Sequence, residues 1–245
     1  MTEIAVVTGS GSGIGRGVAQ KLAQEHFDVA VLDVRADAAK ETVAGLAQSG
    51  QKAFAYGVDV VDAGGIQETR RRILKDLGQP SVVVNCAGWS VIQPFMENDA
   101  AFWKKAIDIN LMGTIVVTRT FLEDLLGRGG GRIVNIASDA GRVGSTGEVV
   151  YAAAKGGVIA FTKSLAREVA RTKVTVNCVC PGPTATPMLM VQDPDRIAAL
   201  TRAIPMRRLA EPADIAAAVA FFASPGAGYV TGQVLSVSGG LTMAG

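Results

Sequence analysis

Three side chains in the second half of the chain have types and spacing suited to proton transfer. Ser138 follows the apolar run RIVNIA, and Tyr151 and Lys155 come later, within YAAAK. At i and i+4, Tyr151 and Lys155 share one face of a helix, so the ammonium can lie beside the phenol. A phenol has a pKa of about 10, and a base working near neutrality needs it lowered by roughly 2 to 3 units. We expect a neighbouring positive charge to supply that shift, although such pairs also occur on helices that do no chemistry.

A glycine-rich turn near the start of the chain is suited to binding phosphate. The first apolar run, residues 3–8, ends in TGSGSGIG at 8–15, and a helical pattern follows at once. Glycines permit positive φ and let the backbone approach a pyrophosphate, whose charge is met by amides at the helix start. Glycines also serve ordinary tight turns, but this position predicts a dinucleotide site. Its residues would be Gly9, Ser12, Gly13, Ile14 and Gly15.

An acidic residue at the end of the second apolar run bears on the choice of cofactor. Asp33 lies 18 residues beyond Gly15, near the offset at which a carboxylate accepts hydrogen bonds from the adenosine ribose. A carboxylate there would repel a 2′-phosphate, which favours NAD over NADP. Two alternatives stay open: Asp33 is a solvated strand-end residue, or Arg35 accommodates the phosphate of NADP.

Further candidate cofactor contacts follow the third and fourth apolar runs. Asp59 and Val60 follow one, and NCAG at 85–88 ends the other. The carboxyl ends of parallel strands meet at one edge of a sheet, where a dinucleotide would lie. Aspartate and asparagine also cap helices and turns, so these residues alone decide nothing. Together with the serine and the tyrosine–lysine pair they predict hydride transfer between a nicotinamide and a secondary alcohol or ketone. The tyrosine would transfer the proton, helped by the nicotinamide cation, and the serine would orient the substrate oxygen.

The apolar runs that must position these residues alternate with helical patterns. Seven runs are short and rich in β-branched residues: 3–8, 28–33, 53–58, 81–85, 132–137, 174–179 and 234–237. Near-continuous apolar strands separated by helices predict a Rossmann-type, doubly wound parallel sheet of about seven strands, in a single α/β domain over 1–245. GRGGGR at 127–132 leads into a strand, so we expect a surface turn. The proline-rich stretch at about 182–212 has no clear pattern and is expected to be a substrate lid.

Composition argues against several other classes of protein. The formal net charge is +2, with 24 basic and 22 acidic side chains and no basic run, which argues against nucleic acid as a partner. No apolar stretch is long enough to span a bilayer and no signal segment opens the chain, so we expect a soluble, cytoplasmic protein. The one histidine, His26, is expected in a surface turn, and we expect no metal site. Cys86, Cys178 and Cys180 form no CxxC pair and are expected to be buried, reduced thiols.

In these motifs the sequence resembles the short-chain dehydrogenase/reductase family, and the resemblance covers the whole chain. The matching positions are TGSGSGIG at 8–15, NCAG at 85–88, Asn110 in DINLMG, the catalytic set Ser138, Tyr151 and Lys155, and the loop residues Pro181, Gly182 and Thr184. The family usually has NNAG, so Cys86 is a departure, and a strand-stabilising role attaches to Asn85, Ala87 and Gly88.

The resemblance also implies roles for individual residues. Asn110 would hold a water molecule that joins the lysine to bulk solvent, and Lys155 would hold the nicotinamide ribose, with Tyr151 also in contact with the cofactor. The loop around Gly182 would touch the nicotinamide end. The family relation further implies a homotetramer, assembled through the Ala-rich helix following Tyr151 and the last strand.

Within the family, the segments at 132–157 and 232–245 are most similar to 2-hydroxycyclohexanecarboxyl-CoA dehydrogenases. Related members act on cyclic or aryl secondary alcohols and on 3-oxoacyl thioesters, so 3-oxoacyl thioester reduction is an alternative. Residues that flank the expected centre would contact substrate, and Arg142 would meet a carboxylate or a coenzyme A phosphate unless it is simply solvated. The full set is Trp89, Ser90, Arg142, Val143, Met188 and Leu189.

Two other functions fit part of the pattern. A non-catalytic protein of the same fold that senses NAD(P) would not need the set of Asn110, Ser138, Tyr151 and Lys155. A methyltransferase has a similar glycine-rich first turn but leaves the tyrosine–lysine pair without a role.

Overall fold

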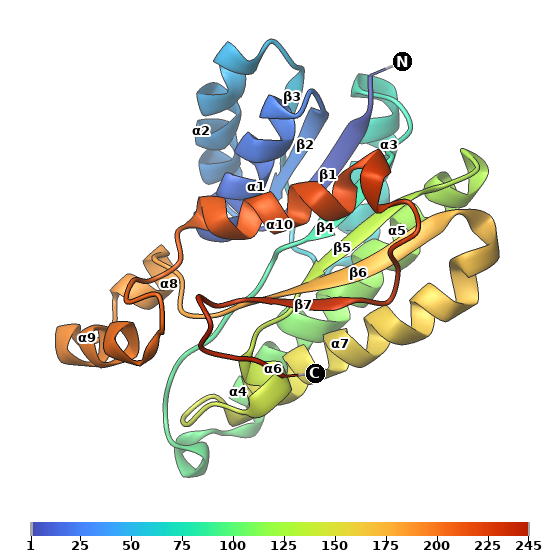
Figure 1. Ribbon diagram of the computed structural model, residues 1–245. Coiled ribbons are helices and arrows are strands. Elements are labelled where there is room, and N and C mark those ends of the chain that lie inside the picture. The colour runs from blue at the N-terminus through green and yellow to red at the C-terminus, as the bar shows by residue number, and fades with distance from the viewer. Residues whose placement is uncertain (1, 245) are drawn as a thin grey trace.

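A seven-stranded parallel sheet runs through the middle of the molecule (Figure 1). The computed structural model describes residues 2–244. The strands lie in the order β3-β2-β1-β4-β5-β6-β7, and every neighbouring pair is parallel. Their bounds are β1 Ile4–Thr8, β2 Asp28–Asp33, β3 Ala53–Gly57, β4 Val82–Asn85, β5 Gly131–Ile136, β6 Val174–Pro181 and β7 Val234–Val237. The predicted α/β doubly wound fold is therefore confirmed.

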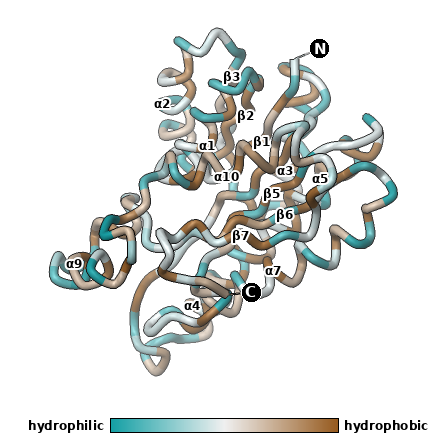
Figure 2. Tube along the Cα trace, viewed as in Figure 1, coloured by the Kyte–Doolittle hydropathy of each residue, from teal (hydrophilic) through white to brown (hydrophobic). Residues whose placement is uncertain are grey.

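The central strands are mostly apolar because both faces of the sheet are covered. In β1, Ala5 and Val7 join one hydrophobic cluster while Val6, which lies between them, joins another. Successive side chains of a strand point to opposite faces, so an unbroken apolar run supplies two cores at once. Figure 2 shows the resulting concentration of hydrophobic residues along the strands.

Three helices cover each face of the sheet. The first cluster receives side chains from α1 (Gly13–Gln24), α2 (Ala36–Leu46) and α10 (Pro212–Ala223). The second receives them from α3 (Ala63–Asp76), α5 (Gly113–Gly127) and α7 (Val149–Val169). In α1 the predicted apolar face is buried, since Val18 and Leu22 are one turn apart and both are shielded from solvent.

Smaller elements lie around the carboxyl edge and in the connections. They are α4 Ala100–Ile107, the π-helical turn η3 Asp108–Met112, α6 Ala140–Val143, α8 Pro187–Met190, α9 Pro194–Ala203, and the short turns η1 Ala47–Ser49, η2 Phe95–Glu97, η4 Ala170–Thr172 and η5 Pro225–Ala227. Gly127 ends α5 and Gly131 begins β5, so GRGGGR is the expected turn into a strand. Among the described residues, no helix is both long and apolar enough to cross a membrane.

The proline-rich stretch is more regular than its sequence indicates. It contains α8 and α9, each of which begins with a proline at the first helical position. Asp193 caps α9 by accepting hydrogen bonds from the amides of Asp195 and Arg196. Proline at the first position and aspartate at the N-cap are ordinary helix-start signals. The two helices were not predicted because their sequences lack the apolar repeat of a helix with one buried face.

Candidate active site

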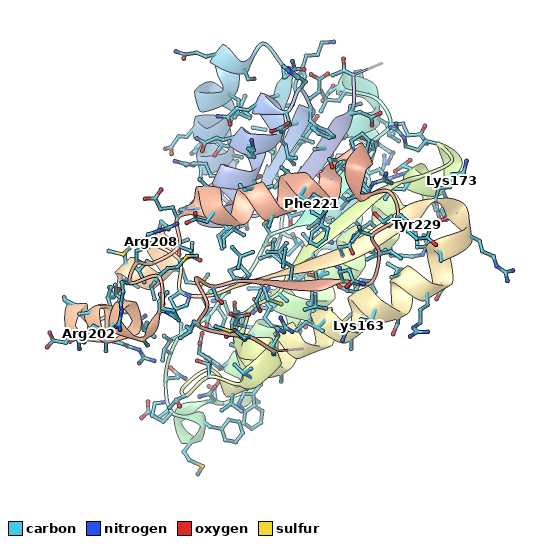
Figure 3. All side chains as sticks on the ribbon, in the orientation of Figure 1. Lys163, Lys173, Arg202, Arg208, Phe221 and Tyr229 are labelled. Atoms are coloured by element: carbon cyan, nitrogen blue, oxygen red, sulfur yellow. The ribbon has the colours of Figure 1, made fainter. Side chains whose placement is uncertain are left out.

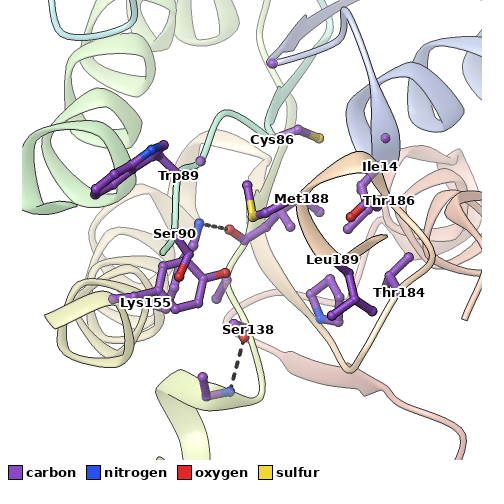
Figure 4. Close-up of a pocket in the computed structure, with 18 of the residues that line it drawn as sticks. Ile14, Cys86, Trp89, Ser90, Ser138, Lys155, Thr184, Thr186, Met188 and Leu189 are labelled. Carbon is purple, nitrogen blue, oxygen red and sulfur yellow. Dashed lines mark hydrogen bonds between the residues drawn. The ribbon is translucent and has the colours of Figure 1, made fainter. Parts of the chain in front are cut away.

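The carboxyl ends of the central strands open into one cavity of about 900 Å³. It is lined from both halves of the chain, by the turn after β1, the ends of β2, β4, β5 and β6, the start of α7, and α8 and α9 (Figure 4). The predicted phosphate turn and the predicted catalytic residues therefore face the same space, as the parallel topology requires.

The glycine-rich turn has the backbone shape that a dinucleotide needs. Gly9 and Gly13 have φ of 61° and 51°, and a Cβ on Gly15 would lie 2.2 Å from the carbonyl oxygen of Gly9. The N-cap Ser12 makes no side-chain hydrogen bond to the first turn of α1, which leaves that turn's amides to an anion. These residues fit the diphosphate of a nicotinamide dinucleotide.

The carboxylate of Asp33 is fixed at the edge of this turn. One oxygen accepts a hydrogen bond of 2.8 Å from the amide of Gly11, and the other accepts one of 2.9 Å from the amide of Arg35. The exposed Arg35 guanidinium lies 3.7 Å from the carboxylate and donates a hydrogen bond of 3.2 Å to Ser12 Oγ. A fixed acidic group therefore lines the cavity, with the exposed guanidinium of Arg35 beside it.

Ser138, Tyr151 and Lys155 all line the cavity. Ser138 follows β5 and its Oγ accepts a hydrogen bond of 3.1 Å from the amide of Ala140 (Figure 4). Tyr151 and Lys155 lie one turn apart on α7. The Lys155 ammonium is buried, donates a hydrogen bond of 2.9 Å to the Ile136 carbonyl, and lies 5.7 Å from the centre of the Tyr151 ring. The predicted cluster is thus assembled.

Both ionisable groups of the pair on α7 have shifted pKa values. Burial raises the pKa of Tyr151 above its ordinary value and the charge of Glu148 raises it further, whereas the Ser138 hydroxyl lowers it. Burial also lowers the pKa of Lys155 to about 8. Without a cofactor, the lysine does not lower the pKa of the phenol below its ordinary value, because desolvation penalises the charged form of each group. The expectation was that the ammonium and the nicotinamide cation act together, and it stays a prediction. The nicotinamide cation, the other charge in that argument, would have to supply the shift.

Asn110 lies in the π-helical turn η3, directly behind the cavity wall. It is fully buried, and its side chain accepts a hydrogen bond of 3.0 Å from the Trp89 amide. It also donates hydrogen bonds of 2.7 Å to the Trp89 carbonyl and 2.9 Å to the Ala106 carbonyl. A Cβ on Gly88 would lie 3.1 Å from Asn110 Oδ1 and 3.5 Å from Lys155 Nζ. Asn110 therefore holds the loop after β4 close to the lysine.

Asn85 does not line the cavity, so the structure does not place it with the other predicted cofactor residues. Its amide is buried and donates hydrogen bonds of 2.9 Å to Thr118 and 2.8 Å to Asn135. It tethers β4 to α5 and β5, in agreement with the strand-stabilising role that the family resemblance implies. Cys86 does line the cavity, and burial raises the pKa of its thiol to about 12, so it is not a nucleophile near neutrality.

The other predicted cofactor residues line the cavity. These are Gly9, Ser12, Gly13, Ile14, Gly15, Asp33, Asp59, Val60, Ala87, Gly88, Pro181, Gly182 and Thr184. Of the predicted substrate contacts, Trp89, Ser90, Val143, Met188 and Leu189 also line it.

Arg142 is the exception among the predicted substrate contacts. Its Nη1 donates a hydrogen bond of 2.7 Å to Ser236 Oγ, and its Nη2 donates one to the Ala244 carbonyl. The short helix α6 directs the guanidinium toward β7 and the C-terminal segment, so the half-buried Arg142 bonds within the chain and does not line the cavity.

Sequence reasoning missed an acidic residue beside the catalytic pair. Glu148 lines the cavity, and its carboxylate accepts hydrogen bonds of 3.0 Å from Ser90 Oγ and 2.7 Å from Ser145 Oγ. Its position three residues before Tyr151 was a usable signal. Leu241 and Thr242 were also missed, and they had no local signal because they reach the cavity only once β7 pairs with β6.

Comparison with known proteins agrees with this fold. Residues 9–242 match the family described as enoyl-(acyl carrier protein) reductase, and the chain belongs to the short-chain dehydrogenase/reductase family of oxidoreductases. It is 40% identical over 249 residues to human (3R)-3-hydroxyacyl-CoA dehydrogenase, covering 98% of this chain and 95% of the relative. It is 38% identical over 245 residues to an acetoacetyl-CoA reductase of Allochromatium vinosum, covering 99% of this chain and 100% of the relative. It is also 38% identical over 245 residues to a 2,3-dihydroxy-2,3-dihydro-p-cumate dehydrogenase of Pseudomonas putida, covering 98% of this chain and 95% of the relative.

Proposed function

We propose that this protein interconverts a secondary alcohol and a ketone with NAD(H), and that its substrates are 3-hydroxyacyl and 3-oxoacyl thioesters. The observation that carries the reaction type is the presence of Ser138, Tyr151 and Lys155 in the cavity that begins at the glycine-rich turn of α1. A phosphate-binding turn and a buried acid–base pair in one cavity are the parts that nicotinamide-dependent alcohol oxidation needs.

In this proposal the chain's own residues manage the proton and the geometry. Bound NAD supplies a hydride acceptor at its nicotinamide C4 and a positive ring charge. Tyr151 Oη accepts the hydroxyl proton during oxidation and returns it during reduction. Ser138 Oγ, held by the Ala140 amide, hydrogen-bonds the substrate oxygen and orients it. Lys155, fixed by the Ile136 carbonyl, holds the nicotinamide ribose, and Asn110 holds the loop against it.

The relatives support the choice of thioester substrates. Human (3R)-3-hydroxyacyl-CoA dehydrogenase and the Allochromatium acetoacetyl-CoA reductase are both named for 3-position chemistry on coenzyme A esters. The p-cumate relative is named for a cyclic diol, which supports a second candidate class of cyclic alcohols, including 2-hydroxycyclohexanecarboxyl-CoA. Within this proposal, residues 182–212 form the substrate lid, since Met188, Leu189 and Arg196 line the cavity. The homotetramer and the cytoplasmic location stay predictions.

A substrate panel tests the proposed function. Absorbance at 340 nm is followed with NAD or NADP and with 3-hydroxybutyryl-CoA, 2-hydroxycyclohexanecarboxyl-CoA and an aryl secondary alcohol. We expect the highest kcat/KM for the 3-hydroxyacyl thioester. Higher kcat/KM for the cyclic thioester would move the assignment to the second class. No turnover of any alcohol or ketone would favour a sensor that binds NAD(P) without reaction.

The choice of NAD is tested at Asp33. The Asp33→Asn variant keeps the shape of the side chain but removes the charge that would repel a 2′-phosphate. We expect wild type to prefer NAD, and the variant to raise kcat/KM for NADP relative to NAD by about tenfold. A wild-type preference for NADP would show that Arg35 decides the specificity instead.

A further inference from the structure

The C-terminal segment, residues 238–244, supplies part of the cavity wall. Leu241 and Thr242 line the cavity together with Val143, Met188 and Leu189. Figure 1 shows this segment leaving β7 on the side of α8 and α9 and ending beside α6. It therefore passes between the proposed lid and the loop that carries Ser138.

One end of the segment is attached to the lid stretch. The Met206 amide donates a hydrogen bond of 3.1 Å to the Gly239 carbonyl. Gly239 and Gly240 have φ of 61° and 87°, and a Cβ on Gly240 would lie 3.2 Å from Pro205. The turn then closes on Ser238, whose carbonyl and Oγ each accept a hydrogen bond of 3.2 Å from the segment, from the amides of Leu241 and Thr242.

The other end is attached to α6 through Arg142. Its guanidinium bonds both the Ala244 carbonyl and Ser236 Oγ, and Ser236 Oγ in turn donates a hydrogen bond to Asp139. Asp139 follows Ser138 directly and is 6% exposed, and its second carboxylate oxygen is buried without a hydrogen-bond partner among the described residues. A buried carboxylate favours a guanidinium nearby. Arg142 thus links α6, β7 and the C-terminal segment.

We propose that Leu241 and Thr242 select the substrate by contacting its apolar chain or ring, and that Arg142 is the positioning residue that holds them there. This proposal rests on the proposed function for the identity of the substrate. Leu241 completes an apolar wall with Val143, Met188 and Leu189, which suits the apolar part of an acyl chain or ring. The hydroxyl of Thr242 adds one polar contact to that wall.

We call the two hydrogen bonds of Arg142, to Ser236 and to Ala244, the anchor of the C-terminal segment. Steady-state kinetics of Arg142→Met with acetoacetyl-CoA and 3-oxooctanoyl-CoA test it. Loss of two hydrogen bonds from a charged group should raise KM for the longer substrate by about tenfold. We expect kcat and the dissociation constant of NAD to change by less than about twofold, since neither depends on the wall. Arg142→Lys can keep one of the two bonds and should fall between. Arg167→Met, at an exposed position on α7, is the matched control and should behave as wild type.

A double-mutant cycle with Leu241→Ala asks whether the two residues act together. If Arg142 acts by placing Leu241, each single variant raises KM for 3-oxooctanoyl-CoA. The KM of the double variant is then no higher than that of the more strongly affected single variant. Independent effects that multiply in the double variant, or an unchanged KM in Arg142→Met, would overturn the proposal. Should Arg142→Met fail to fold, an unchanged KM in Leu241→Ala alone would overturn it.

Hydrogen exchange gives a readout that does not depend on the substrate. The amide of Thr242 should exchange faster in Arg142→Met than in wild type, because the segment has lost its anchor. Unchanged exchange would contradict the anchor even if the kinetics followed expectation. A wild-type enzyme that turns over no thioester, together with faster exchange in the variant, would contradict the proposed function and leave the anchor standing.

Discussion

At the scale of single residues, the site combines groups whose charges are costly to bury. Tyr151 and Lys155 share a helix face as their spacing predicts, yet burial opposes ionisation of both. Spacing along a helix gives proximity, whereas the pKa depends on the solvent that the whole fold removes. For the same reason, sequence could place Arg142 near Ser138 but could not show that Ser236 and Ala244 would bind it.

The first residue-scale prediction concerns Glu148→Gln. The Glu148 carboxylate raises the pKa of Tyr151, so removing its charge should lower that pKa, with Ser138, Lys155 and Cys180 still facing the phenol. Tyr151 must be deprotonated to accept the proton in alcohol oxidation. The rise of kcat/KM with pH should therefore move to lower pH in the variant. Glu168→Gln, an exposed site on the same helix, is the control. A profile that stays in place or moves upward would contradict this role of Glu148.

The second concerns Lys155→Met in the cofactor-free protein. Burial lowers the pKa of Lys155 from 10.5 to about 8, which corresponds to a destabilisation of the folded state by about 3 kcal/mol. The hydrogen bond from Lys155 to the Ile136 carbonyl offsets about 1 kcal/mol of this, and the variant loses that bond. The variant should gain about 2 kcal/mol in free energy of unfolding at pH 7 and lose turnover. The gain should be full below about pH 8, where the amine is charged in both states, and should fade as the pH approaches 10.5. Urea unfolding at several pH values measures it, and a loss of stability at pH 7 would contradict the account.

At the scale of elements, local signals predicted the strands well because each carries its own pattern. Predicted and observed bounds of β2 and β7 coincide, while β6 continues to Pro181 because Cys180 and Pro181 still pair with β7. Helices α8 and α9 were missed since they lack a buried apolar face to produce a repeat, and none of their residues is buried. Capping residues mark where a helix begins, but burial of one face is what makes its pattern visible.

The element-scale prediction concerns the glycine-rich turn. In Gly15→Ala the new Cβ would meet the Gly9 carbonyl at 2.2 Å, so the turn between β1 and α1 must open. We expect the dissociation constant of NAD to rise by about a hundredfold, which corresponds to roughly 3 kcal/mol. Gly45→Ala in α2 is the control, because its Cβ would have no neighbour within 4 Å, and it should stabilise the protein by about 0.5–1 kcal/mol. Fluorescence titration with NADH measures affinity, and unaltered binding in Gly15→Ala would contradict the assignment of the turn.

At the scale of the whole molecule, the alternation of strands and helices was enough to predict the sheet, because right-handed crossovers leave few topologies. That topology brought Gly13, Asp33 and Tyr151 to one cavity. The contribution of Leu241 and Thr242 could not be predicted, since it depends on contacts between the chain's end and α6 that no local pattern encodes.

Assembly also belongs to the scale of the whole molecule. Phe221 on α10 and Tyr229 before β7 are exposed (Figure 3), and so is Leu235 on β7 itself. Exposed apolar side chains are a common feature of surfaces where protein chains meet. The tetramer that the family resemblance implies stays a prediction.

In the proposed reaction the Tyr151 hydroxyl transfers the proton, while NAD is held mainly by other residues. The most direct test is Tyr151→Phe, which removes only that hydroxyl, with kcat measured at 340 nm and the dissociation constant of NAD by titration. We predict that kcat falls by at least about a thousandfold while NAD affinity stays within about threefold of wild type. A variant that keeps a tenth or more of wild-type kcat would contradict the claim and show that another group moves the proton.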